Sequence, residues 1–200
     1  MIQNIYLKRS IDLIFSFLGL LVLSPIFFLI SIVVKLSSNG PIIFVQSRIG
    51  QFGKPFNMYK FRTMINKSSG QNHITTINDK RVTTVGRFLR KYKLDELPEL
   101  FNVFIGNMSL VGPRPDVPGY ADKLEGEDRR ILELKPGITG IACLTYANEE
   151  KLLATKKNPQ IFNDTVIWPH KVTLNLQYYY DNNILMDFRI IFSTIFRTNY

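Results

Sequence analysis

The sequence predicts an α+β fold that is predominantly helical, with an N-terminal re-entrant membrane helix and a small cytoplasmic domain that contains a β-hairpin. Three observations predict it: an uncharged apolar run over residues 13–34, strand-like alternation after residue 41, and apolar residues at helical spacing further on. We expect the membrane helix to occupy residues 1–36 and the second domain to occupy residues 37–200.

The composition excludes several classes of protein. Of the 200 residues, 46% are hydrophobic, which excludes a wholly disordered or low-complexity chain. The single cysteine, Cys143, excludes an intramolecular disulfide, and the distant His73 and His170 make a structural zinc site unexpected. The net charge of +9 admits three kinds of partner: nucleic acid, an anionic membrane surface, or a phosphorylated substrate.

The apolar run from Leu13 to Val34 is about 22 residues long, near the length that crosses a bilayer. A cleaved signal peptide is disfavoured because the run is long and Lys35 follows it where small residues should stand. A straight spanning anchor is disfavoured by Ser24-Pro25, since a proline there removes a backbone hydrogen bond and predicts a break. The Ser24 hydroxyl can bond a freed carbonyl, which makes such a break tolerable in lipid.

The charges on either side of the run favour re-entry over spanning. Lys8 and Arg9 precede it, and Lys35 and Arg48 follow it. A spanning helix would place one basic flank outside, against the positive-inside tendency, whereas a helix that bends and returns keeps both flanks in the cytoplasm.

The next segment predicts a β-hairpin. Residues 42–45 and 56–62 have strand character and flank a turn-rich stretch at residues 50–55. Alternation places Lys60 and Arg62 on one face, which is either a solvated face or a cationic site. The polar residues 66–80 predict a loop.

Two helices follow in the sequence. Apolar residues at helical spacing predict the first over residues 85–92, within a stretch that contains six cations, namely Lys80, Arg81, Arg87, Arg90, Lys91 and Lys93. Because proline is favourable only in the first turn of a helix, Pro98 predicts that the second begins near Asp95 or Glu96, with Asp95 as a favoured N-cap.

The adjacent carboxylates Asp95-Glu96 allow two interpretations. One is ordinary capping of a helix. The other is a phosphate site, since helix N-termini and cations both attract anions. In such a site, an ionised carboxylate can hold a divalent cation or attack phosphorus.

Further along the chain, Gly112-Pro113-Arg114-Pro115 predicts a stiff turn that suits bidentate binding of phosphate by Arg114, or a plain loop arginine. We expect an exposed charged helix at residues 122–134. Residues 187–196 either lie along a membrane interface or pack as a terminal core helix.

In their order, these segments resemble the bacterial sugar transferases, or monotopic phosphoglycosyl transferases. The resemblance runs from about residue 5 to residue 142, with a weaker echo at 187–196. The matching motifs are Lys8-Arg9 with Asp12, Ser24-Pro25, Tyr59-Lys60-Phe61-Arg62-Thr63-Met64, Arg87 and Arg90, Leu94-Asp95-Glu96-Leu97-Pro98, Gly106-Asn107-Met108-Ser109, Gly112-Pro113-Arg114-Pro115 and Lys135-Pro136-Gly137-Ile138-Thr139-Gly140.

The resemblance implies an enzyme that transfers a sugar 1-phosphate from a UDP-sugar to a polyprenol (undecaprenyl) phosphate, releases UMP and initiates surface-glycan synthesis. It implies a catalytic domain on the cytoplasmic face of the bacterial inner membrane. Asp95 would be the nucleophile that carries a covalent phosphosugar, and Glu96 its dyad partner, which assists either the positioning of Mg²⁺ or proton transfer. Asp95 and Glu96 would also be the metal-binding residues. Lys60, Arg90 and Arg114 would bind phosphate.

The chain departs from the family pattern after Gly140. Ala147 stands where an active-site arginine is common, and Arg129, Arg130 and Lys171 are candidates to supply the missing charge. The choice of sugar is least readable in residues 143–186, and the sequence leaves both the sugar and the role of this segment open.

Two other functions compete with the enzyme interpretation. The first is a basic membrane tether for nucleic acid or anionic lipid. It gives Asp95-Glu96 no role, because two carboxylates within a cationic stretch weaken binding to an anionic partner. An inactive scaffold would keep the fold without the chemistry. The enzyme interpretation accounts for the apolar run, the cations and the carboxylates together, so we expect no nucleic-acid partner and leave a homo-oligomer open.

Overall fold

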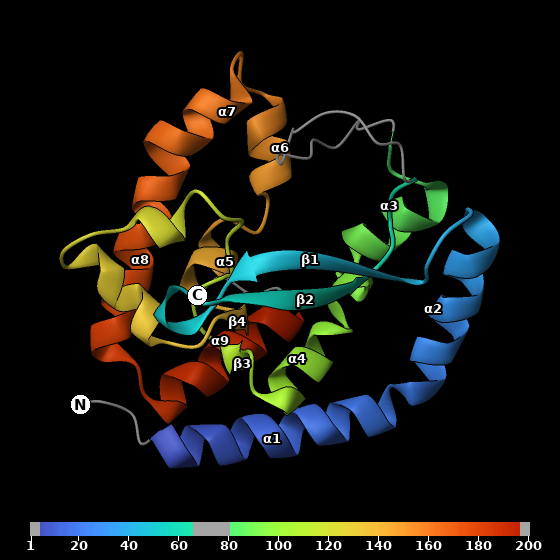
Figure 1. The fold of residues 1–200 in the computed structure, drawn as a ribbon, viewed down its shortest axis with the longest axis horizontal. Helices are drawn as coiled ribbons and strands as arrows, with labels where there is room; N and C mark the ends of the chain where they lie inside the picture. Colours follow the sequence, from blue (N-terminus) through green and yellow to red (C-terminus); the bar gives the residue numbers. More distant parts are fainter. Residues whose placement is uncertain (1–4, 66–80, 197–200) are drawn as a thin grey trace.

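A computed structural model describes residues 5–65 and 81–196 of the chain. The fold is α+β and mostly helical, as the sequence predicts (Figure 1). The elements run in the order α1 (Ile5–Val22), α2 (Ser24–Ser37), β1 (Ile43–Ile49), β2 (Pro55–Phe61), α3 (Thr84–Lys91), α4 (Glu99–Ile105), β3 (Ser109–Val111), β4 (Gly137–Thr139), α5 (Ile141–Thr145), α6 (Glu149–Ala154), α7 (Pro159–Phe162), α8 (Trp168–Asp181) and α9 (Ile184–Phe196).

The apolar run forms two helices, α1 and α2, which meet at an angle of 61°. The bend falls at Leu23, directly before Ser24-Pro25, which confirms the predicted break. Pro25 lies in the first turn of α2, where its missing N–H costs no helical bond, and the Ser24 hydroxyl donates to the carbonyl of Leu21 at 2.8 Å. Among the described helices, none alone is long and apolar enough to cross a membrane; α1 and α2 meet that criterion only as a bent pair.

Helix α1 lies along one edge of the molecule and is fixed there by its polar side chains (Figure 1). The buried carboxylate of Asp12 accepts the N–H of Leu110 at 2.9 Å. Arg9 donates to the carbonyls of Val103 and Phe104 at 2.7 and 2.8 Å, at the C-terminal end of α4. Lys8 forms an ion pair with Asp187 of α9 at 2.6 Å. The outer sides of α1 and α2 expose large apolar residues, among them Phe15, Phe17, Phe28 and Leu29.

The predicted β-hairpin is confirmed, with a first strand that is longer than expected and a second strand that begins and ends one residue earlier. Strands β1 and β2 pair antiparallel from Ile43 opposite Phe61 to Ile49 opposite Pro55. Phe61 packs in a core cluster with Ile30 and Val34 of α2 and with Leu89 of α3. Directly after β2, the buried Arg62 donates to the carbonyl of Ser38 at 2.6 Å and also to that of Pro41, so it holds the end of α2 against the hairpin.

Two short parallel strands, β3 and β4, place the turn that carries Arg114. The N–H of Gly112 donates to Thr139, and that of Gly137 donates to Pro113, at 2.9 and 2.8 Å. A Cβ atom on Gly112 would lie 2.4 Å from the carbonyl oxygen of Lys135, so only glycine allows this approach. The turn from Gly112 to Pro115 is therefore fixed at its base.

Two predictions about helices are wrong. Asp95 does not cap a helix: it lies in a 3₁₀ turn, Leu94–Glu96, and α4 begins later with Pro98 at its N-cap position, because left-handed Lys93 redirects the chain before the turn. Residues 122–134 form no continuous helix but two 3₁₀ segments, Ala121–Lys123 and Asp128–Glu133. Gly126 between them is left-handed, and Ile131 is buried, so the stretch is neither regular nor wholly exposed.

Helix α9 combines features of both interpretations of the C-terminal segment. Ile190 is buried against Val111 and Tyr178, whereas Leu185, Phe192 and Ile195 are exposed. The loop predicted over residues 66–80 lies outside the described residues.

The contact at Gly112 predicts a specific instability. We expect Gly112→Ala to destabilise the protein by about 2 kcal/mol, because the new methyl group meets backbone that cannot move independently. Thermal unfolding followed by circular dichroism should show a Tm lower by about 4–8 °C. As a control, Gly19→Ala places its Cβ against the flexible end of Leu100 and should be tolerated. Equal Tm values for Gly112→Ala and the parent would contradict the argument.

Candidate active site

The carboxylates Asp95 and Glu96 lie on the 3₁₀ turn between α3 and α4. Asp95 is 8% exposed, and its Oδ1 accepts no hydrogen bond from the described residues. Burial, together with the neighbouring charge of Glu96, raises the pKa of Asp95, while Lys60 and Lys93 oppose the rise. Asp95 is therefore a buried carboxylate, and its buried Oδ1 has no hydrogen-bond partner among the described residues.

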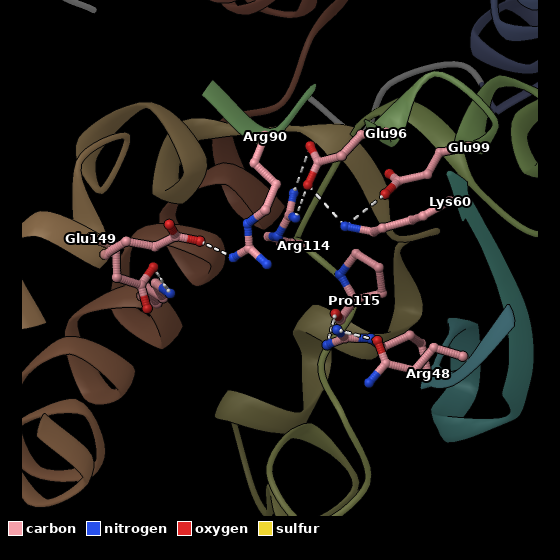
Figure 2. Close-up of polar contacts among 11 residues, drawn as sticks. Arg48, Lys60, Arg90, Glu96, Glu99, Arg114, Pro115 and Glu149 are labelled. Carbon is pink, nitrogen blue, oxygen red and sulfur yellow. Dashed lines mark hydrogen bonds and ion pairs between the residues drawn. The ribbon is translucent and has the colours of Figure 1, made fainter. Parts of the chain in front are cut away.

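Glu96 is held by two cations, as Figure 2 shows. Arg114 pairs with it through two nitrogens, to Oε1 and, at 3.4 Å, to Oε2. Lys60 of β2 donates to Oε1 at 2.8 Å. Burial alone would raise the pKa of Glu96, but Arg114 and Lys60 outweigh burial and hold it well below its usual range. Glu96 is thus ionised and fixed in place.

The structure adds Glu99, which our sequence analysis missed. It is 1% exposed, and Lys60 lies 3.2 Å from its Oε1 (Figure 2). Burial raises the pKa of Glu99 even though Lys60 is close. The sequence contained a signal for this residue: side chains three positions apart on a helical turn lie on the same side of it, so Glu99 is expected near Glu96.

The predicted cations do not all meet at the same carboxylate. Lys60 and Arg114 converge on Glu96, whereas Arg90 of α3 pairs with Glu150 in the first turn of α6. Ser24 and Pro25 lie at the bend between α1 and α2 and are not among the residues of this cluster.

The three candidates for the charge missing at Ala147 have different surroundings. Arg129 donates to the carbonyl of Leu124 at 3.0 Å, and Arg130 pairs with Glu127 at 3.2 Å, each within its own surface segment. Lys171 of α8 pairs with Glu149 at 2.6 Å, next to the glutamate that holds Arg90. Of the three, Lys171 lies nearest to the cationic cluster.

Asp116, next to the Arg114 turn, is a second residue that we missed. Burial raises its pKa to about 7, although the charges of Lys171, Arg48 and Arg114 lower it. Arg48 also donates to the carbonyl of Pro115 at 3.2 Å (Figure 2), which helps to hold the turn. An ordinary Pro-Asp dipeptide gives no sequence signal for such burial.

One carboxylate oxygen, Oδ1 of Asp95, is the candidate ligand for a divalent cation at this site. No group of three or more His, Cys, Asp or Glu residues suited to a metal occurs in the part of the chain that the structure describes. Mg²⁺ commonly takes one or two carboxylates and completes its shell with substrate phosphates and water. Oδ1 of Asp95 can serve as such a ligand, whereas Glu96 would first have to release a cation.

Comparison with known proteins decides the family. The family model for bacterial sugar transferases matches residues 3–199. The chain belongs to this family. The bacterial sugar transferase is 39% identical over 199 residues to the UDP-glucose:undecaprenyl-phosphate glucose-1-phosphate transferase of Escherichia coli, an alignment that covers 97% of this chain and 40% of that protein.

Other relatives extend the comparison. The UDP-N-acetylgalactosamine-undecaprenyl-phosphate N-acetylgalactosaminephosphotransferase of Aeromonas hydrophila is 32% identical, with 95% of this chain and 43% of that protein covered. The exopolysaccharide production protein PSS of Rhizobium leguminosarum bv. phaseoli is 34% identical, with 96% and 95% covered. The bacterial sugar transferase thus spans less than half of the first two of these relatives and nearly all of the third.

The raised pKa of Asp116 predicts a pH-dependent stability. An aspartate whose pKa is higher in the folded than in the unfolded state binds more protons when folded, so the free energy of unfolding falls as pH rises from about 4 to about 7. Asp116→Asn removes this contribution. Its Tm should therefore decline less between pH 5 and pH 7.5 than that of the parent, and parallel declines would contradict the assignment.

Proposed function

We propose that this bacterial sugar transferase moves a sugar 1-phosphate from a UDP-sugar to undecaprenyl phosphate, releasing UMP and initiating synthesis of a surface glycan. The observation that carries the proposal is the buried Asp95, one oxygen of which has no hydrogen-bond partner among the described residues, beside a glutamate held by two cations. The names of the Escherichia coli and Aeromonas hydrophila relatives, which specify transfer to undecaprenyl phosphate, support it.

The proposed reaction has two displacements at phosphorus. In the first, a carboxylate oxygen of Asp95 bonds to the phosphorus that carries the sugar, and the bond from that phosphorus to the oxygen bridging the two phosphates breaks, so that UMP leaves. In the second, an oxygen of undecaprenyl phosphate attacks the same phosphorus and frees the Asp95 carboxylate. The product is undecaprenyl-diphosphate-sugar, and both steps need positioning and charge neutralisation.

The surrounding residues have separate roles in this scheme. Glu96 holds Arg114 and Lys60 next to Asp95, so that both cations are in place when phosphate arrives. Arg90 releases the carboxylate of Glu150 and binds a phosphate of the donor in its place, so that one anion replaces another.

A magnesium ion, held by Asp95 with Glu96 nearby, would neutralise phosphate charge when bound. Oδ1 of Asp95, which has no hydrogen-bond partner among the described residues, supports this assignment.

We further propose that residues 1–36 form a re-entrant membrane helix and residues 37–200 the catalytic domain, on the cytoplasmic face of the bacterial inner membrane. The 61° bend at Ser24-Pro25 and the exposed apolar sides of α1 and α2 support re-entry. The acceptor lipid lies in the same membrane.

The first test is release of UMP. Purified protein with Mg²⁺, undecaprenyl phosphate and a panel of UDP-sugars should release UMP with at least one donor. Asp95→Asn should lower the rate by about a thousandfold or more, because an amide cannot replace the nucleophilic carboxylate. Asp128→Asn, which changes an exposed aspartate in a 3₁₀ segment, serves as the matched control and should retain the parent rate.

Mass spectrometry separates this mechanism from its competitors. With donor but no acceptor, the parent should carry a phosphosugar on Asp95. Turnover without this adduct would refute the covalent route, and a protein indifferent to Asp95→Asn would fit a basic membrane tether instead.

The second test is topology. In a Cys143→Ser background, cysteines introduced at Gln3 and Lys54 should both react with a membrane-impermeant reagent applied from the cytoplasmic side. Pro25→Ala should favour a straighter helix and shift part of the label at position 3 to the outer side. An N-terminus that is labelled only from outside in the parent would refute re-entry.

A further inference from the structure

Lys93 has an unusual backbone conformation directly before the Asp95-Glu96 turn. Its φ and ψ are 59° and 21°, in the left-handed region that non-glycine residues seldom adopt. Lys93 directly follows Tyr92, the C-cap residue of α3, at a position where helices often carry glycine or asparagine. Helix termination alone would be served better by glycine, so the lysine needs another explanation.

The lysine conformation also fixes the carboxylates. The N–H of Lys93 donates to the carbonyl of Arg90 at 3.2 Å, and its own carbonyl accepts the N–H of Glu96 at 3.3 Å. One residue therefore closes α3 and opens the 3₁₀ turn on which Asp95 is buried. Non-glycine residues in strained conformations cluster at functional sites.

Among the residues that the structure describes, the ammonium of Lys93 has no carboxylate partner, unlike the cations around it. Lys60 and Arg114 pair with Glu96, and Arg90 pairs with Glu150. Within residues 5–65 and 81–196, the exposed ammonium of Lys93 has no ion pair, although its charge acts on both Asp95 and Glu96. It can bind an incoming anion without first breaking an ion pair to these residues.

We propose that Lys93 is a further phosphate-binding residue, held beside Asp95 by its left-handed conformation so that an unpaired ammonium meets the incoming phosphate. This inference rests on the proposed function and adds a residue to it. The phosphate belongs either to the nucleotide donor or to the lipid acceptor.

Titration calorimetry of the full-length protein in detergent tests the proposal, with UDP and undecaprenyl phosphate as separate probes. Lys93→Gln removes the charge and keeps the long stem. Lys93→Gly removes the charge and relieves the backbone. Both should weaken binding of at least one probe by about tenfold or more, as expected for loss of a charge-assisted contact. Lys93→Arg should bind nearly as well as the parent.

Two comparisons separate binding from structure. Lys123→Gln removes the same charge from a 3₁₀ turn away from the dyad and should bind both probes like the parent. The Tm of Lys93→Gly should equal or exceed that of the parent, because glycine adopts the left-handed conformation without strain. Weaker binding with an undiminished Tm is a result that a mere helix terminator would not give.

The outcomes are distinct. If Lys93→Gln weakens binding of UDP, Lys93 binds a phosphate of the donor. If it weakens binding of undecaprenyl phosphate, Lys93 binds the phosphate of the acceptor. Parent-like affinity of Lys93→Gln for both probes, or no binding of either probe by the parent, overturns the role of Lys93. If binding depends on Lys93 while the parent releases no UMP from any donor, the proposed reaction fails and the phosphate site stands.

Discussion

The ionised Glu96, buried between Arg114 and Lys60, is the interaction on which the rest of the site depends. A buried charge is costly unless it is paired, and removing one partner leaves the other charges uncompensated. The three residues come from the 3₁₀ turn, from β2 and from the loop after β3, which are far apart in the sequence. Their meeting therefore requires the hairpin, the helix α4 and the β3–β4 pair to be correctly placed together, so that the fold and the charge balance of the site stabilise each other.

The same principle governs the attachment of the apolar helices. Helix α1 is apolar on its outer side, yet Lys8, Arg9 and Asp12 bind partners in α9, α4 and β3. These are directional contacts at three separate points, whereas apolar packing alone would allow the helix to slide or rotate. The position of α1 is thus specified by a few polar side chains in an otherwise hydrophobic sequence.

The sequence was informative wherever a local rule applied. Proline chemistry predicted the break at Ser24-Pro25, and alternation predicted the hairpin, because both effects act over a few residues. It failed where tertiary contacts override local preference: the left-handed Lys93 moved Asp95 off the helix, and Gly126 broke the stretch expected to be helical. The family resemblance implied that Lys60 and Arg114 bind phosphate, but the pairing of both with Glu96 was found only in the structure. The burial of Glu99 and the raised pKa of Asp116 depend on elements distant in sequence, which no local pattern encodes.

Strand β2 and the residue after it have a mechanical consequence. Lys60 donates a hydrogen bond to Glu96. Two positions later, about 7 Å along the chain, Arg62 donates to the carbonyl of Ser38 at the end of α2. Phe61, which lies between them, is buried in the core and leaves residues 60–62 little freedom to bend. A tilt of α2 must therefore either break the hydrogen bonds of Arg62 or displace Lys60, whose ammonium neutralises Glu96. The geometry of the apolar hairpin and the electrostatic balance of the reaction centre are mechanically coupled through a single tripeptide.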